Sequence, residues 1–173
     1  MRVKSVPDVK FCLVFQCETL SVPVMRHVLG DTLRRLGMDE ESVYDILVAA
    51  TEACTNVLMH GGQEVREYAV VTSLGAVGCQ VQVTDDGAGA VFAQAGFREG
   101  APGEPSLPGG PQEHQLETAI ADLPESGRGL AIMRACVDNV TLDSSPGHGT
   151  VVTMRKHVRW SRNAPLRQFR AAS

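Results

Sequence analysis

A long amphipathic helix is the feature that most constrains the fold of this chain. Between Asp39 and Gly61, apolar side chains recur at steps of three and four, the spacing that gives a helix one apolar face. The positions are Val43, Ile46, Leu47, Ala50, Ala53, Cys54, Val57 and Leu58. Residues 40–42 are typical of a helix N-terminus, and the two glycines from Gly61 are typical of an end. The sequence therefore predicts a helix with one buried face.

Strands and shorter helices are predicted on both sides of this helix. Alternating apolar residues indicate the strands, and turns containing glycine separate them. Ser21 is a candidate cap for a first helix, and Gly37 offers its end. The predicted elements are a strand over 11–17, a helix over 21–36, strands over 67–74 and 77–84, a helix over 130–135, and strands over 137–142 and 150–158 around a turn at 144–147.

Composition places the chain among single-domain soluble proteins. It has 173 residues, of which 43% are hydrophobic and 21% charged, enough for one core. A net charge of −4 argues against a general nucleic-acid binder, which needs a basic surface. The five cysteines are scattered without a CxxC pair, which favours reduced core thiols over disulfides or structural zinc. The sequence also lacks a membrane span and a secretory signal, so we expect a cytoplasmic protein.

Two segments have a composition unlike the rest. Residues 91–125 hold five of the nine prolines and five glycines, and so long a loop in one domain is either functional or disordered. From residue 155 onward the chain carries six basic residues and no acidic one. Residues 159–173 are expected to form a flexible basic tail, with a partner contact as the alternative.

Glu52, Asn56 and His60 form the first candidate functional group. Steps of four residues place all three near one side of the long helix, roughly opposite its apolar stripe. An amide oxygen is a neutral ligand for Mg²⁺, and a carboxylate one turn away can accept a proton. The same residues also suit the solvent-exposed face of any amphipathic helix, and a histidine is favoured near a helix C-terminus without any ligand.

The second candidate group is Asp85 with Gly87 and Gly89, at the end of a predicted buried strand. The carboxylate can accept a hydrogen bond from an exocyclic amine, and the glycines allow close approach of a flat ring. Taken alone, the string DDGAG is also typical of a turn.

The third candidate group is the glycine-rich entry to the helix predicted at Leu130. Gly127 and Gly129 would leave backbone N–H groups pointing at an anion, and Arg128 could add a cationic contact to phosphate. An ordinary glycine-containing helix start has the same composition. Other nucleotide signatures are absent from the sequence: it has no GxxxxGK[ST], no HRD and DFG pair, and no GxGxxG.

Taken in order, these groups resemble the GHKL, or Bergerat-fold, ATPases, and in detail their branch of bacterial anti-sigma-factor serine kinases. The matching strings are EACTNVLMHG at 52–61, VTDDGAG at 83–89, SGRGLAIM at 126–133 and GTVVTMRK at 149–156. The resemblance covers residues 11–158. It implies an α/β sandwich in one domain over residues 1–158, with a mixed β-sheet, helices on one face, and a long ATP lid over about 90–125.

The resemblance also implies roles for the matched residues. Glu52 would be the base that activates the attacking hydroxyl, Asn56 would bind Mg²⁺, and Asp85 would bind the adenine amine. The remaining implied ATP-binding residues are Gly87 and Gly89 beside the adenine, Gly127, Arg128, Gly129 and Leu130 around the phosphates, and Thr150 near the adenine.

The implied function is an ATP-dependent protein-serine kinase. Such a protein sequesters a sigma factor, phosphorylates a serine of an anti-anti-sigma partner, and often forms a homodimer. Two departures from the family pattern are Ala90, where a bulkier apolar residue is usual, and the insertion GEPSLPGGPQEHQ at 103–115.

These departures favour an alternative, a nucleotide-gated binding module with little transfer activity. The catalytic half of a sensor histidine kinase is a third hypothesis, disfavoured because only about ten residues precede the first strand. The fourth is an α/β domain whose motifs are coincidental.

Overall fold

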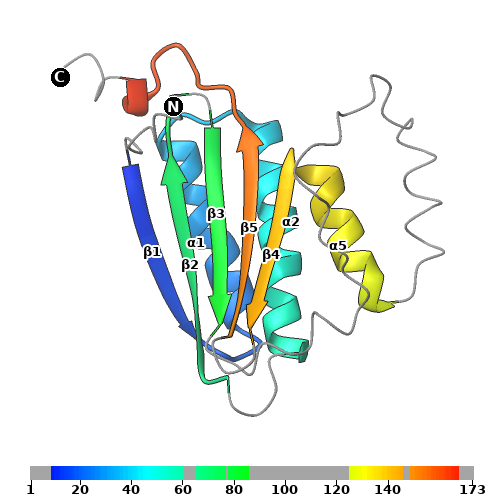
Figure 1. Cartoon of the computed structure of the whole chain (residues 1–173). Coiled ribbons are helices and arrows are strands. Elements are labelled where there is room, and N and C mark those ends of the chain that lie inside the picture. The colour runs from blue at the N-terminus through cyan, green and yellow to red at the C-terminus, as the bar shows by residue number, and fades with distance from the viewer. Residues whose placement is uncertain (1–8, 61–64, 77, 86–124, 146–148, 168–173) are drawn as a thin grey trace.

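The computed structural model shows a five-stranded sheet with helices on one face (Figure 1). The residues it describes are 9–60, 65–76, 78–85, 125–145 and 149–167. Their elements are β1 (Val9–Gln16), α1 (Ser21–Arg35), α2 (Glu40–His60), β2 (Glu67–Leu74), β3 (Gly78–Asp85), α5 (Glu125–Cys136), β4 (Asn139–Ser145) and β5 (Gly149–His157). The α/β class and the predicted elements are confirmed, with most boundaries within two residues. The two glycines from Gly61, and Pro146 and Gly147 of the expected turn, lie outside the described residues.

The strand order is β1-β2-β3-β5-β4, and each pair of neighbours in the described part of the chain is antiparallel. The expectation of a mixed sheet is corrected on this point. The chain passes from β3 through α5 to β4, and β5 then turns back and enters between β3 and β4 (Figure 1). The two strands joined by the crossover therefore run parallel without being hydrogen-bonded neighbours.

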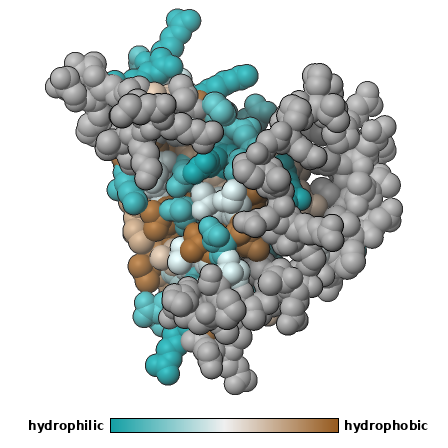
Figure 2. Space-filling view, in the orientation of Figure 1, coloured by the Kyte–Doolittle hydropathy of each residue, from teal (hydrophilic) through white to brown (hydrophobic). Residues whose placement is uncertain are grey.

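The core lies between the sheet and the helix layer. Every second residue of β2 and β3 is buried, which is the pattern of a sheet with one covered face. The register places Val70 opposite Val83 and Val83 opposite Val152, so their side chains share that face. The opposite face is not covered by a helix in the described residues, and there Val14 of β1 is 59% exposed (Figures 1 and 2).

The helix starts differ in one detail from the sequence expectation. Asp39 caps α2, since its Oδ1 accepts a hydrogen bond from the backbone N–H of Ser42 at 3.0 Å. Ser21 does not cap α1: it is the first helical residue, and its hydroxyl donates to the carbonyl of Glu18. The same hydroxyl accepts a hydrogen bond from the buried phenol of Tyr68 at 2.7 Å. The Ser21 oxygen therefore makes a tertiary contact and does not cap the helix.

Residues 159–167 pack against the fold, so the expectation of a flexible tail beginning at residue 159 is wrong for them. Trp160, Ala164 and Leu166 are buried. The backbone N–H of Ser161 donates to the carbonyl of Gly37, which has a φ of +88°. A Cβ on Gly37 would lie 2.6 Å from the Cβ of Ala164, so only glycine allows this approach. The many basic residues of this segment gave no indication that the apolar residues between them are buried.

Two further expectations concerned the cysteines and membrane-spanning helices. The described cysteines are thiols outside any disulfide, and Cys54 and Cys79 are buried, but Cys12 is exposed and does not belong to the core. Burial raises the pKa of the Cys79 thiol to about 12. No helix within the described ranges is long and apolar enough to cross a membrane.

Candidate nucleotide site

Glu52 and Asn56 of α2 lie next to Gly129 of α5. An ideal Cβ on Gly129 of α5 would lie 3.0 Å from Oε2 of Glu52 and 3.4 Å from both Nδ2 and Oδ1 of Asn56. The structure therefore brings together three of the residues that the sequence analysis selected from two separate motifs. A methyl group at position 129 would occupy the space in front of the carboxylate and the amide.

The start of α5 corrects the third motif. Helix α5 begins at Glu125, so Gly127 and Arg128 lie in its first turn and Gly129 follows within the helix. The sequence analysis placed these glycines before the helix, because glycine is a poor helix former. Tertiary contact with α2, where Gly129 lies against Glu52 and Asn56, outweighs that intrinsic cost. Arg128 is exposed, and Leu130 is partly buried.

Asp85 and Thr150 form a second pair, at the ends of β3 and β5. The backbone N–H of Thr150 donates to Oδ1 of Asp85 at 3.3 Å, and both residues are buried. The hydroxyl of Thr150 lies 3.3 Å from that of Ser144 on β4, and either can donate. Sequence reasoning missed Ser144, which carries no motif. Gly87, Gly89, Ala90 and the expected lid as far as residue 124 lie outside the described residues.

The electrostatics of Glu52 suit a proton acceptor. Burial raises the pKa of its carboxyl above the ordinary value of 4.5, because desolvation disfavours the charged form. A carboxylate with a raised pKa binds a proton more strongly than a fully solvated one. The His60 side chain, the third residue of the first motif, is partly buried at the end of α2.

The donor set fits a nucleotide bound with Mg²⁺. Among the described residues, no group of three or more His, Cys, Asp and Glu side chains is arranged to hold a metal ion. Asn56 can offer one neutral oxygen, and Mg²⁺ is usually held by one or two protein groups together with phosphate oxygens and water.

Two long-range contacts support α2 and were not predicted. Arg26 of α1 donates to Oγ1 of Thr51 at 2.6 Å, next to Glu52 in the chain. Lys156 of β5 forms an ion pair with Asp45 of α2 at 2.8 Å. Each partner is a common surface residue type with no local spacing signal, so the sequence offers no means of finding them.

Comparison with known proteins shows which family the chain resembles. A family model described as "Histidine kinase-like ATPase domain" matches residues 15–156. Proteins named Serine-protein kinase RsbW from Bacillus cereus (strain AH820) and Bacillus thuringiensis (strain Al Hakam) are 27% identical over 139 residues, covering 80% of this chain and 78% of theirs.

A solved structure gives the same fold. The crystal structure of the RsbU and RsbW domains of a Mycobacterium tuberculosis protein matches 89% of this chain with a TM-score of 0.58 and 16% identity. The chain spans 33% of that longer chain, so this likeness concerns the fold. Because the family match runs from the end of β1 almost to the end of β5, the chain belongs to the family of histidine kinase-like ATPase domains.

Proposed function

We propose that this protein is an ATP-dependent protein-serine kinase that acts as an anti-sigma factor in the cytoplasm. It phosphorylates a serine of an anti-anti-sigma partner and sequesters a sigma factor, and it acts as a homodimer. The approach of Gly129 to Glu52 and Asn56 carries the proposal, because the start of α5 lies beside a carboxylate and an amide on α2, and we assign phosphate binding, proton acceptance and metal binding to these three groups. The similarity to proteins named as serine-protein kinases supports the choice of acceptor.

Each residue has a distinct task in the proposed reaction. When bound, ATP supplies the phosphoryl group, and Mg²⁺ neutralises the phosphate charge. Asn56 would hold the metal ion, while the first turns of α5, with Gly127, Arg128, Gly129 and Leu130, would bind the phosphates. Glu52 would take the proton of the seryl hydroxyl as the seryl oxygen bonds to the γ-phosphorus of ATP, and the bond from that phosphorus to the bridging oxygen would break to release ADP. Phosphoryl transfer needs positioning and charge neutralisation more than covalent help from the protein, so this small set is sufficient.

The adenine end of the proposed site is the Asp85–Thr150 pair. Oδ1 of Asp85 accepts the Thr150 N–H, which orients the carboxylate. A carboxylate accepts a hydrogen bond from the exocyclic amine of adenine and repels the carbonyl oxygen that guanine has there. Gly87 and Gly89 would let the base approach the backbone.

The test is phosphoryl transfer from labelled ATP with Mg²⁺ to a cognate anti-anti-sigma protein. Wild-type protein should label the partner on serine, and Glu52→Ala should not. Glu41→Ala is the matched control, because Glu41 is an exposed glutamate in the first turn of the same helix. Equal labelling by the wild type and Glu52→Ala would contradict the role given to Glu52.

A nucleotide-gated binding module is the second candidate function. The insertion at 103–115 and Ala90 in the nucleotide motif favour it, since both lie in the segment that would close over ATP. ATP would then select the state that binds the partner, without transfer. Mg²⁺-dependent binding of ATP with no phosphorylated product would favour this function over the kinase.

A further inference from the structure

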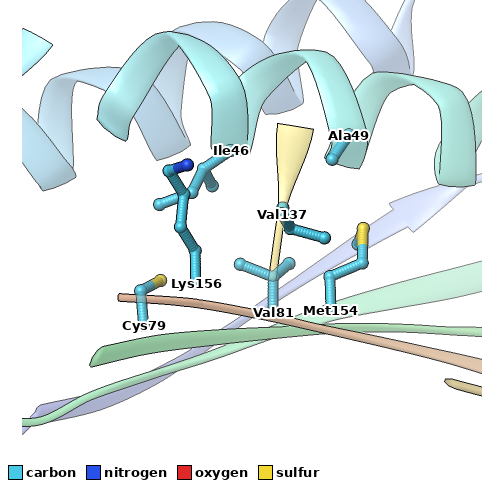
Figure 3. Close-up of a pocket in the computed structure, with 7 residues that line it drawn as sticks. All are labelled: Ile46, Ala49, Cys79, Val81, Val137, Met154 and Lys156. Carbon is cyan, nitrogen blue, oxygen red and sulfur yellow. The ribbon is translucent and has the colours of Figure 1, made fainter. Parts of the chain in front are cut away.

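Lys156 connects α2, α5 and β5 at a point away from the proposed reacting groups. Its Nζ lies 2.8 Å from Oδ2 of Asp45 on α2 and donates to the carbonyl oxygen of Cys136, the last residue of α5, at 2.9 Å. The side chains of Lys156 and Asp45 are only 16% and 26% exposed. Figure 3 shows the Lys156 side chain extending from β5 toward α2, beside a pocket between that helix and the sheet.

The spacing on the two helices relates this connection to the site. Asp45 and Glu52 are seven residues apart on α2, and Gly129 and Cys136 are seven residues apart on α5. Seven residues are close to two helical turns, so each pair lies on one face of its helix, separated by about 10 Å along the axis. Lys156 therefore joins the two helices about two turns away from the place where Gly129 meets Glu52.

The surroundings of Lys156 strengthen its interactions with α2 and α5. Its ammonium group pairs with a carboxylate and with a carbonyl at a helix C-terminus, where the helix dipole favours a cation. The pocket beside it is lined by apolar side chains, among them Ile46 and Met154. An ion pair beside apolar surface is screened less by water than one on an open face.

We propose that Lys156 is a positioning residue for the phosphate end of the nucleotide site. By fixing the C-terminal end of α5 to α2, it sets how closely Gly129 approaches Glu52 and Asn56. Without the Lys156 side chain, α5 can shift relative to α2, and the groups that bind the phosphates are then displaced. The Asp85–Thr150 pair stays in position. This inference rests on the proposed function, because it assigns the phosphates to the α5 end and adenine to the other.

The experiment compares ATP with adenosine, which lacks phosphates and reports on the adenine end. Full-length Lys156→Met is titrated calorimetrically with each ligand in the presence of MgCl2. We expect the Kd for ATP to rise roughly tenfold, as misplaced binding groups cost affinity, and the Kd for adenosine to stay unchanged. Lys156→Arg should recover most of the ATP affinity, because a guanidinium can still pair with Asp45.

Arg155→Met is the matched control. Arg155 is the preceding residue of β5, is exposed, and donates from Nε to Gln80 on the face of the sheet away from the helices. It should leave both Kd values unchanged. Asp45→Asn is a second variant for use if Lys156→Met does not fold, and it should raise the Kd for ATP selectively but less, because the contact to the Cys136 carbonyl remains.

The outcomes separate this inference from the proposed function. Parallel weakening of ATP and adenosine, or no change in either, would overturn the positioning role and leave the kinase proposal standing. Wild-type protein that binds no ATP would overturn the kinase proposal itself, and with it this inference. Selective loss of ATP affinity that Lys156→Arg restores supports both.

Discussion

Thr150 donates its backbone N–H to the carboxylate of Asp85 at 3.3 Å, so the start of β5 orients the last residue of β3. The two residues are 65 positions apart and meet because β5 pairs with β3 up to Val151 and Thr84, the residues next to them. The contact uses Oδ1, so a backbone group of β5 helps to orient this carboxyl group.

Asp85→Asn should change base preference without unfolding the protein. The amide oxygen can still accept the Thr150 N–H, and the amide nitrogen then stands where Asp85 has its other oxygen. That nitrogen donates to the carbonyl oxygen of guanine and no longer accepts from the amine of adenine. We expect the ratio of ATP to GTP affinity to fall by on the order of tenfold, measured by competition binding. An unchanged ratio would contradict the placement of adenine at Asp85.

Gly129→Ala should weaken nucleotide binding while leaving the fold intact. Alanine is favoured over glycine within a helix by about 1 kcal/mol, so the melting temperature should stay level or rise. The added methyl lies 3.0 Å from Glu52 Oε2 and displaces the carboxylate. We expect the Kd for ATP to rise roughly tenfold. Gly75→Ala is the control, since its Cβ would meet nothing nearer than 4.0 Å, and it should change neither quantity.

Glu52→Gln should abolish transfer and also stabilise the protein at neutral pH. Burial raises the pKa of Glu52, so the folded state holds a proton more tightly than the unfolded one, and ionisation disfavours folding as the pH rises above 4.5. Glu52→Gln removes the charge, so it should increase the free energy of unfolding at pH 7 and leave it unchanged well below pH 4.5. Denaturant unfolding of both proteins between pH 4 and 8 measures the difference, which should grow with pH.

The same pKa governs the activity of the wild type. The ionised carboxylate is the proton acceptor, so transfer should increase with pH through a value above 4.5. The loss in Glu52→Gln should be on the order of 100-fold or more. A pH–rate profile that is flat between pH 4 and 8 would argue against Glu52 as the base.

Asp39→Ala should destabilise the fold by about 2 kcal/mol, since it removes a helix cap and a link to the C-terminal segment. Oδ1 accepts from the N–H of Ser42 at 3.0 Å, and Oδ2 accepts from the N–H of Arg159 at 3.2 Å. Asp31→Ala, which removes exposed ion pairs on α1, should change the free energy of unfolding by less than about 0.5 kcal/mol.

This stabilisation should depend on pH. Burial would raise the pKa of Asp39, but hydrogen bonds from Ser42 and Arg159 outweigh burial and lower it below 3.8. The stabilising contribution is therefore present above pH 3.8 and is lost as the pH falls through the lower folded value. The difference between wild type and Asp39→Ala in urea unfolding should narrow below pH 3.8. A constant difference down to pH 2 would contradict the link.

The sequence contained enough to predict the elements and half of the site. Apolar periodicity located α2 and the strands, because one buried face repeats along each element. The four-residue step between Glu52 and Asn56 is a property of one helix, so their shared side could be predicted locally. Gly129 could be assigned to the same site only from the order of the motifs along the chain, because no local sequence rule predicts which helix packs on α2.

The contacts between distant segments could not be predicted. The Asp85–Thr150 and Asp45–Lys156 pairs depend on the register of β5, which is set when the strand enters the sheet. The packing of Trp160 and Leu166 was missed because basic residues surround them, and charge spacing gives no sign of burial. The early start of α5 was missed because tertiary contact outweighed glycine's low helix propensity.

The insertion of β5 between β3 and β4 has a consequence for synthesis of the protein. Among the described strands, β5 leaves the ribosome last, yet it occupies an interior place in the sheet. A nascent chain that ends before Thr150 holds β3 and β4 without the strand that joins them, and its Asp85 has no Thr150 to orient it. Nucleotide affinity should therefore arise only after β5 has emerged from the exit tunnel.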